Sequence, residues 1–361
     1  MTKVLLSNGR ALGAEFRHLS LPGQTPPPPS RIFAKRLVVI SAGALSTPCI
    51  LERSGIGNPE VLAAAGISVK SPLEGVGENF QDHYRIAVGY RTDGSYETLT
   101  DFAAATGDPA EREAAEREFR ARGAGKLATN YSFFGGKVSP KTSWDLSEVG
   151  ARNADFFARH PDKPAVMMST LSMYVFAAPD LREELDADVR LERRRLITLG
   201  LWTCYPRSTG SVHVLSPDPE AEPRIVTGYL DDDDDVRLLG WGYSVTDKVM
   251  MGMKGVTGKD PATHPRDGES LERFVRRSVG TPYHFSGTAR MGKAEAGGVL
   301  SEKLEVHGVE GLMVADLSVC PSNLGADTYH PALLVGEKAA DLIAEKLGLD
   351  LGIAGKQLVG C

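Results

Sequence analysis

The chain has 361 residues, 42% of them hydrophobic and 24% charged, an ordinary composition for a globular protein with room for two domains. Its formal net charge of -6 argues against nucleic acid as a partner, because nucleic-acid binding requires a basic face. No segment is apolar and long enough to span a membrane, and the first residues lack a signal-peptide pattern, so an intracellular compartment, cytoplasmic or peroxisomal, is favoured over secretion.

Neither the acidic run nor the cysteines predict a metal site. Residues 231–235 are all aspartate, and such adjacent like charges repel one another, so we expect a solvated loop or a helix start there. The four cysteines, Cys49, Cys204, Cys320 and Cys361, are widely spaced without Cys-x-x-Cys. Buried apolar thiols are therefore expected, rather than zinc ligands or a disulfide framework.

The first predicted elements form half of a nucleotide-binding unit. Asn8-Gly9 is the strongest short hairpin signal and separates two short strands. The apolar, β-branched run 36–41 predicts a strand buried on both faces of a parallel sheet. A small-residue turn then leads into a helix over 47–53, with Pro48 in its first turn. This order is typical of one half of a dinucleotide-binding βαβ unit.

Later elements are predicted from periodicity and from helix-capping residues. Helices are expected over 111–122, 181–195, 236–251, 270–278 and 332–347, and a strand over 211–215. Ser270 is expected to cap its helix, and Gly348 suits the end of the last one. One face of the last helix is expected to hold Leu333, Val335, Ala339, Ala340, Ile343 and Leu347.

Two glycine clusters, 55–57 and 75–77, could be mistaken for phosphate-binding loops. Both lack the third glycine of G-x-G-x-x-G, and neither directly follows a strand. Each belongs instead to a longer motif, 43–57 (GALSTPCILERSGIG) and 75–83 (GVGENFQDH). Downstream motifs are 283–292 (YHFSGTARMG) and 314–329 (VADLSVCPSNLGADTY).

In order and context, these motifs resemble the glucose–methanol–choline (GMC) oxidoreductases, FAD enzymes that oxidise alcohols. The segment 314–329 is most similar to the alcohol (methanol) oxidase branch. The resemblance implies an α/β plus α+β fold, with an incomplete, Rossmann-like FAD-binding domain and a substrate domain built on an antiparallel sheet flanked by helices. The implied boundaries are 1–90 for the rest of the FAD-binding domain, 91–280 for the substrate domain and 281–361 for a catalytic segment that returns to the first domain, with the family's carboxy-terminal domain over about 205–345.

The resemblance also implies a catalytic base and a cofactor site. His284 lies where the family places its catalytic histidine, and imidazole suits removal of an alcohol proton because its pKa lies near working pH. Asp316 would approach the FAD pyrophosphate and ribityl region through its backbone N–H, or it caps the turn after its strand. The remaining cofactor positions are small or polar residues that allow close approach to FAD, namely Ala42, Gly43, Gly325, Ala326 and Thr328.

Asp327 is the informative departure from the family. It occupies the slot of a second histidine or, in alcohol oxidases, an asparagine that donates a hydrogen bond to the substrate oxygen; an ionised Asp cannot donate. Three alternatives stay open: Asp327 carries a proton, catalysis is impaired, or His330 reaches the site instead. A helix-start role is favoured for His330, which precedes Pro331.

The sequence therefore predicts an FAD-dependent oxidoreductase acting on a small-molecule alcohol. The chain has no G-x-G-x-x-G after a strand, so we expect an amino-terminal half to be missing and FAD binding by this polypeptide alone to be poor. The alternatives are an inactive fragment or degenerate relative, and an FAD-containing lyase on the same scaffold.

Overall fold

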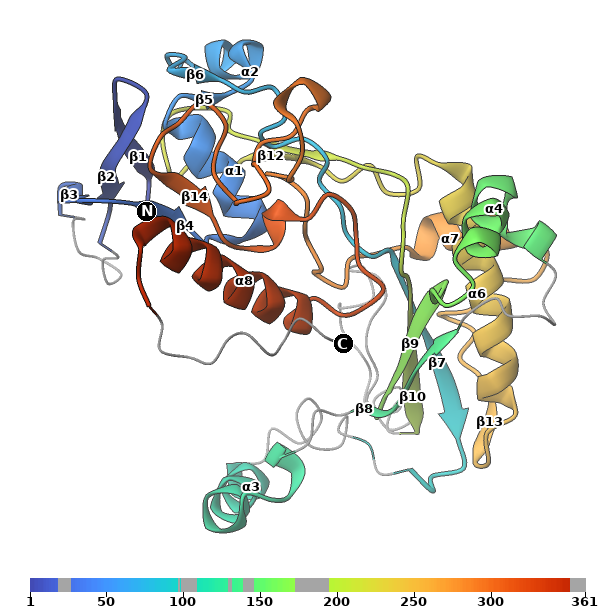
Figure 1. Cartoon of the computed structure of the whole chain (residues 1–361). Helices are drawn as coiled ribbons and strands as arrows, with labels where there is room; N and C mark the ends of the chain where they lie inside the picture. Colours follow the sequence, from blue (N-terminus) through green and yellow to red (C-terminus); the bar gives the residue numbers. More distant parts are fainter. Residues whose placement is uncertain are drawn as a thin grey trace. The chain divides into compact units, whose positions relative to one another are not determined.

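The computed structural model describes residues 1–18, 27–96, 98, 109–128, 132–138, 146–172 and 195–350. The chain forms two compact units, each assembled from segments distant in sequence (Figure 1). Unit 1 combines Met1–Asp82, Thr209–Gly228 and His284–Cys361, and unit 2 combines His83–Ser208 and Tyr229–Tyr283. Across the described ranges, no helix is long and apolar enough to cross a membrane.

Unit 1 begins with the predicted hairpin. Strands β1 (Lys3–Ser7) and β2 (Arg10–Phe16) pair antiparallel, and β3 (Ser30–Phe33) adds a third strand beside β2. Asn8 and Gly9 both have positive φ, 47° and 73°, as the tight turn of a two-residue hairpin requires. The Asn-Gly signal is confirmed.

A parallel pair of strands joins the start of unit 1 to its end. Strand β4 (Val38–Ile40) lies beside β14 (Leu312–Val314), in register over all three residues. The expectation of burial on both faces is wrong at the middle position. Val39 is 38% exposed while its neighbours are buried, so only one face of β4 packs into the core.

Helix α1 (Gly43–Arg53) begins earlier than the predicted residue 47, so Pro48 lies inside the helix rather than in its first turn. Proline has no N–H to donate to the carbonyl one turn before it, at Ala44. The Thr288 hydroxyl donates to this Ala44 carbonyl instead, at 2.7 Å. A side chain from the far end of the sequence thus satisfies the group that Pro48 leaves unpaired.

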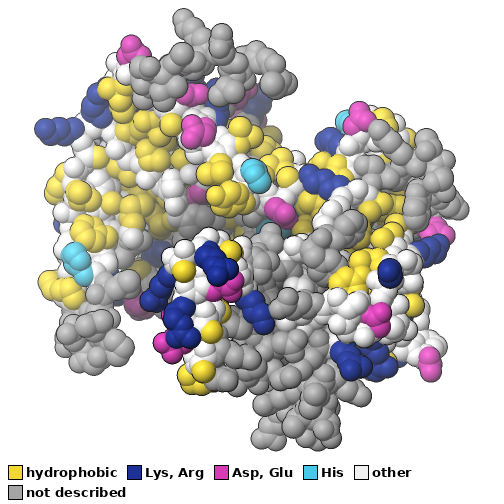
Figure 2. Space-filling view, turned by 90° about the horizontal axis from the view of Figure 1, so that it is seen from below, with side chains coloured by type: hydrophobic (Ala, Val, Ile, Leu, Met, Phe, Trp, Pro, Cys, Tyr) yellow, Lys and Arg dark blue, Asp and Glu magenta, His cyan; other side chains and the backbone are white. Residues whose placement is uncertain are grey.

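Helix α8 (Tyr329–Leu347) also begins before its predicted start, and Gly348 ends it in the left-handed conformation, as expected. The predicted apolar face is partly wrong. Ala339 is buried, and Val335 and Ile343 pack against the unit 1 core, but Leu333 is 53% exposed and Ala340 is exposed. Hydrophobic side chains gather over unit 1 in the view of Figure 2.

Shorter elements complete unit 1. They are β5 (Ile56–Gly57), α2 (Pro59–Ala64), β6 (Ser71–Pro72), β11 (Ser211–His213), β12 (Arg224–Val226), and the 3₁₀ turns η5 (Ala294–Ala296) and η6 (Leu317–Val319). The predicted strand over 211–215 is thus confirmed in its first half. Strands β5 and β6 pair parallel, and β11 and β12 pair antiparallel.

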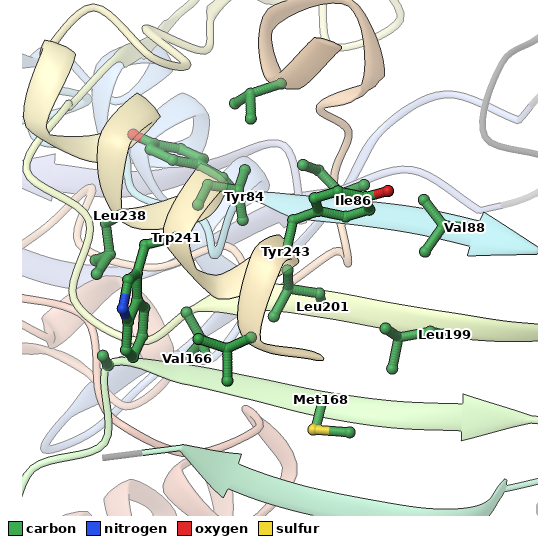
Figure 3. Close-up of a cluster of buried hydrophobic side chains, with 14 of the residues drawn as sticks. Tyr84, Ile86, Val88, Val166, Met168, Leu199, Leu201, Leu238, Trp241 and Tyr243 are labelled. Carbon is green, nitrogen blue, oxygen red and sulfur yellow. The ribbon is translucent and has the colours of Figure 1, made fainter. Parts of the chain in front are cut away.

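Unit 2 is built on the antiparallel sheet that the fold class predicts. The strand order is β13-β7-β10-β9-β8, and every neighbouring pair is antiparallel. The strands are β7 (Arg85–Thr92), β8 (Ser132–Val138), β9 (Val166–Leu171), β10 (Leu196–Thr203) and β13 (Val256–Lys259). Figure 3 shows side chains of α6 (Asp233–Met251), including Trp241, beside Val166 and Leu201 of the central strands.

The predicted helices of unit 2 are confirmed where the structure describes them. They are α3 (Pro109–Arg122), α6, and α7 (Leu271–Ser278), whose N-cap Ser270 accepts from the Arg273 N–H. The helix predicted over 181–195 lies outside the described residues, apart from Arg195 at its end. Unit 2 also contains α4 (Ala151–Arg159), η2 (Lys126–Ala128) and η3 (Leu146–Val149).

The acidic run starts α6, as one of its two interpretations predicted. Asp232 is the N-cap, and the next three aspartates fill the first turn, where the helix dipole favours negative charge. Asp235 is not solvated, however; it is buried and accepts hydrogen bonds from Ser208 and from the Arg207 N–H. Burial raises the pKa of Asp235, and the hydrogen bonds from Ser208 and Arg207 partly oppose that rise.

The cysteines follow the expectation where they are described. Cys49, Cys204 and Cys320 are buried thiols outside any disulfide, while Cys361 lies outside the described residues. Burial raises the pKa of the Cys49 and Cys320 thiols to about 11, and the neighbouring Asp316 acts in the same direction on Cys320. Both are protonated thiols at neutral pH and are therefore poor nucleophiles.

Candidate active site

The candidate base, His284, lies on a segment held from both sides. Its backbone N–H donates to the buried Asp82 carboxylate at 2.9 Å. Two residues further on, Ser286 exchanges two backbone hydrogen bonds with Gln81, at 3.0 and 2.9 Å. The His284 side chain is 15% exposed. The backbone of the segment is fixed, while the imidazole keeps limited access to solvent.

The glycine turn after His284 docks the same segment on α1. Gly287 has φ of +88°, and a Cβ there would lie 2.5 Å from the Asn79 carbonyl oxygen, so the close approach requires glycine. Thr288 then reaches Ala44 of α1 through its hydroxyl, and its own carbonyl accepts from the Gly77 N–H at 2.9 Å. The motif 75–83 and the motif at His284 are thus direct neighbours.

Asp327 and His284 come together, although they are distant in sequence. Asp327 Oδ1 lies 3.8 Å from His284 Nε2, and the Asp327 side chain is 60% exposed. This separation is too long for a hydrogen bond but permits an ion pair when the imidazole is protonated. His330 lies in the first turn of α8 and is exposed, with its ring edge-on to Tyr329 at 5.5 Å.

Asp316 follows β14, and its carboxylate makes three hydrogen bonds within the protein. One oxygen accepts from the Gly43 N–H at 3.0 Å and from the Thr47 hydroxyl at 2.6 Å, and the other accepts from the Ser318 N–H at 2.8 Å. Asp316 is thereby the N-cap of η6, as the capping interpretation predicts, and it also holds the start of α1. Both carboxylate oxygens therefore have hydrogen-bond donors within the protein.

The small residues of the predicted cofactor site lie at two helix starts. Ala42 is the exposed N-cap of α1 and precedes Gly43. A Cβ atom added at Gly43 would have no other atom within 4 Å. Gly325 and Ala326 are half-buried and precede Thr328, the N-cap of α8. The Thr328 side chain makes no capping hydrogen bond, so the positive end of this long helix is not neutralised by its own cap.

A cluster of ionisable side chains that the motifs did not predict lies beside α1. Glu52 is fully buried; one oxygen lies 2.7 Å from His213 Nδ1, and the other accepts from the Val214 N–H. His213 Nε2 lies 3.1 Å from a carboxylate oxygen of Glu78, in the motif 75–83. The hydrogen bond to Glu52, above all, raises the pKa of His213, with both carboxylates contributing and burial opposing. Glu52, an acidic residue among apolar ones in the predicted helix, was the sequence feature that could have indicated this cluster.

Gln81 and Asp82 are two further residues beside His284 that were not predicted individually. Both are buried, at 4% and 0% exposure, and both bond to the segment that carries His284. Their place in the motif 75–83 was the only hint, because a motif shows that residues recur together but not which of them touch.

Comparison with known proteins gives matches along most of the chain. Two models described as GMC oxidoreductase match residues 1–85 and 206–336. Alcohol oxidase 1 of Komagataella phaffii and alcohol oxidase of Candida boidinii are each 30% identical, over 99% of this chain and 63% of the relative. A variant of the Aspergillus oryzae formate oxidase superposes with a TM-score of 0.78 at 24% identity, covering 96% of this chain and 59% of that chain.

These matches bear on the expected missing half. The model for the family's amino-terminal part matches residues 1–85, so the likeness is not confined to the carboxy-terminal part, and the missing half is not supported. The chain nevertheless spans 63% of the length of the alcohol oxidases it matches. Because the two models together cover more than half of the 361 residues, the chain belongs to the GMC oxidoreductase family.

Proposed function

We propose that the protein is an FAD-dependent oxidoreductase that oxidises the CH–OH group of a small alcohol, with His284 as the base. One observation carries the proposal: His284 Nε2 lies 3.8 Å from the exposed Asp327 carboxylate, on a segment whose backbone is fixed by Asp82 and Gln81. In this proposal unit 1 binds the cofactor, and unit 2 supplies the substrate domain. The printed names of the relatives, alcohol oxidases, support this substrate class.

The residues present fit an FAD cofactor. The α8 start has no side-chain cap, and the backbone near it is half-buried rather than covered, so its N–H groups can face a ring that becomes negatively charged. Gly43 is open above its Cα, which permits close approach of a ligand to the start of α1. When bound, FAD would supply the hydride acceptor. The Asp316 carboxylate organises this site by holding Gly43 and Thr47.

His284 would take the hydroxyl proton of the alcohol at its imidazole. A positioned base of this kind contributes roughly 10²–10⁴-fold in rate. Asp327 would then stabilise the imidazolium across the 3.8 Å separation, screened by solvent because its side chain is 60% exposed. The same carboxylate is a poor substitute for a hydrogen-bond donor to the substrate oxygen.

The test combines cofactor binding with substrate reduction. Purified protein is titrated with FAD and then mixed anaerobically with primary alcohols while the flavin absorbance is followed. We expect bleaching in the wild type and a loss of at least about 100-fold in its rate for His284→Ala. Wild-type rates in His284→Ala would refute the base assignment, and absence of a shifted flavin spectrum would refute cofactor binding by this chain.

One observation keeps an FAD-containing lyase as the second candidate. Asp327 occupies the donor position beside His284, and an ionised carboxylate does not favour negative charge building up on a nearby flavin. A lyase would bind FAD and leave it oxidised in the presence of alcohol. The anaerobic experiment therefore separates the two functions.

A further inference from the structure

The side chain of Gln81 connects its own segment, 79–82, to the segment 321–323 of unit 1. Its amide oxygen accepts from the Asn323 N–H at 2.9 Å. Its amide nitrogen donates to the Asn79 side-chain oxygen at 2.9 Å and to the Pro321 carbonyl at 3.3 Å. The partners fix the orientation of the amide, because rotating it by half a turn would set donor against donor and acceptor against acceptor.

The backbone of the same residue holds the segment of the proposed base. Gln81 and Ser286 exchange their N–H and C=O groups, and the neighbouring Asp82 carboxylate accepts from the His284 N–H. The Ser286 hydroxyl in turn donates to the Asn323 side-chain oxygen at 3.1 Å. The three segments therefore close into a ring of hydrogen bonds, 79–82 to 284–287 to 321–323 and back.

Burial makes this ring strong. Gln81, Ser286 and Asn323 are 4%, 3% and 5% exposed, so water cannot replace a lost partner at low cost. Asn79 adds two more bonds from its amide nitrogen, to the Gly287 and Pro321 carbonyls. One arm of the ring ends at His284, and the other continues through the short stretch from Asn323 to Asp327. Both residues of the pair are therefore joined to the ring through the backbone.

We propose that Gln81 is a positioning residue, whose side-chain amide fixes the separation of His284 and Asp327. The effect of Gln81 on catalysis rests on the proposed function. Its effect on the distance between His284 and Asp327 can be tested without turnover. Gln81→Glu is the sharpest variant, since it keeps the acceptor for Asn323 but turns a second oxygen toward two acceptors, Asn79 Oδ1 and the Pro321 carbonyl. Gln81→Met removes the hydrogen bonds without adding charge.

The readout is the electrostatic coupling between His284 and Asp327. Protein labelled with ¹³C at the histidine Cε1 is titrated by NMR, and the His284 signal is identified by its absence in His284→Gln. In the wild-type background, Asp327→Asn should lower the titration midpoint of His284, because it removes a facing negative charge. In the Gln81→Glu background, the same substitution should shift the midpoint by less than half as much, in a double-mutant cycle.

Asn58→Asp provides the matched control. It makes the same amide-to-carboxylate change at the N-cap of α2, where a carboxylate can still accept from the Glu60 N–H. There the shift caused by Asp327→Asn should stay at its wild-type size. Equal shifts in the wild-type and Gln81→Glu backgrounds, or no shift in the wild type, would overturn the inference. If Gln81→Glu does not fold, Gln81→Met gives the same comparison with the same two outcomes.

Turnover adds a second readout that can fail independently. If the protein oxidises alcohols, Gln81→Glu should lower kcat/KM by about 10–100-fold, the range expected for a misplaced catalytic group. In the Gln81→Glu background, Asp327→Asn should also no longer shift the pH dependence of kcat/KM. If the wild type does not reduce flavin at all, the proposed function fails, while the NMR cycle still decides whether Gln81 sets the geometry.

Discussion

At the residue scale, the proposed activity of the candidate site can be tested at Asp327. It lies 3.8 Å from His284, in the position where the family resemblance implies a hydrogen-bond donor. Asp327→Asn should raise the rate of alcohol-dependent flavin reduction by about tenfold, because the amide can donate to the substrate oxygen and removes a repelling charge. Anaerobic stopped-flow measurement of flavin bleaching tests this.

The control for that prediction lies on the same helix that Asp327 precedes. Asp341 is exposed on α8, and Asp341→Asn removes the same charge away from the helix start. It should leave the bleaching rate unchanged. A slower rate in Asp327→Asn would show that the carboxylate itself serves the reaction, through its pairing with the imidazole.

Gly77 gives a second prediction at this scale. Its φ is +81°, and a Cβ there would lie 2.4 Å from the Val212 carbonyl oxygen and 2.7 Å from His213 Nδ1. Gly77→Ala should therefore lower the free energy of unfolding by about 2–4 kcal/mol, as backbone strain and overpacking combine. Urea denaturation followed by circular dichroism measures the loss.

Gly66→Ala separates the two causes in Gly77→Ala. Gly66 also has positive φ, +69°, but no atom lies within 4 Å of a would-be Cβ. This variant should lose only the conformational part, about 1 kcal/mol. Equal losses at both positions would mean that the neighbours of Gly77 relax freely, and that the contact with β11 is loose.

At the scale of elements, the sequence predicted local structure better than element limits. Asn8-Gly9 and Ser270 act within a few residues, so the hairpin and the start of α7 were predictable. The start of α1 was not, because the carbonyl that Pro48 leaves without a donor in the helix binds Thr288, a contact across the chain. His284 could be named as the candidate base from its motif, whereas the hydrogen bonds of Gln81 depend on which segments meet in the fold.

The contact between α1 and β11 gives a pH-dependent prediction. His213 lies between Glu52 and Glu78, and its pKa is raised, so the folded state holds the proton more tightly than the unfolded chain. The stabilisation from this pairing is complete below the ordinary histidine pKa, about 6.5, and is lost as the pH rises through the folded value. His213→Gln should therefore destabilise the protein more at pH 6 than at pH 9.

Denaturation of wild type and His213→Gln at both pH values measures this difference. Glu78→Gln serves as the control, because it removes the half-exposed partner and leaves the buried Glu52 pairing in place. It should show the same sign and a smaller size. A deficit for His213→Gln that does not change with pH would mean that His213 is neutral in the folded state.

At the scale of the whole molecule, the two units have separate cores, and their histidines His213 and His264 have pKa values shifted in opposite directions. In unit 2, His264 donates from Nε2 to the Gly89 carbonyl at 2.8 Å, so Nδ1 must accept from the Tyr243 hydroxyl at 2.8 Å. Both nitrogens are satisfied in the neutral form. Burial lowers the pKa of His264, against the smaller opposite effect of its hydrogen bond to Gly89.

Acidification should consequently weaken unit 2 and spare the His213 pairing in unit 1. The folded pKa of His264 is below the unfolded value, so its stabilisation is present above about pH 6.5 and falls as the pH drops below it, by up to about 1.4 kcal/mol for each pKa unit of difference. All three tryptophans (Trp144, Trp202 and Trp241) belong to the segments of unit 2, so tryptophan fluorescence follows that unit alone. The urea transition followed by fluorescence should lie at a lower urea concentration at pH 5.5 than at pH 8. This difference should be smaller in His264→Gln. Hydrogen exchange at α1 and β11 should show no matching loss of protection at pH 5.5. Equal losses of stability in both units would show that they unfold together as one cooperative body, so that the titration of each histidine affects both units.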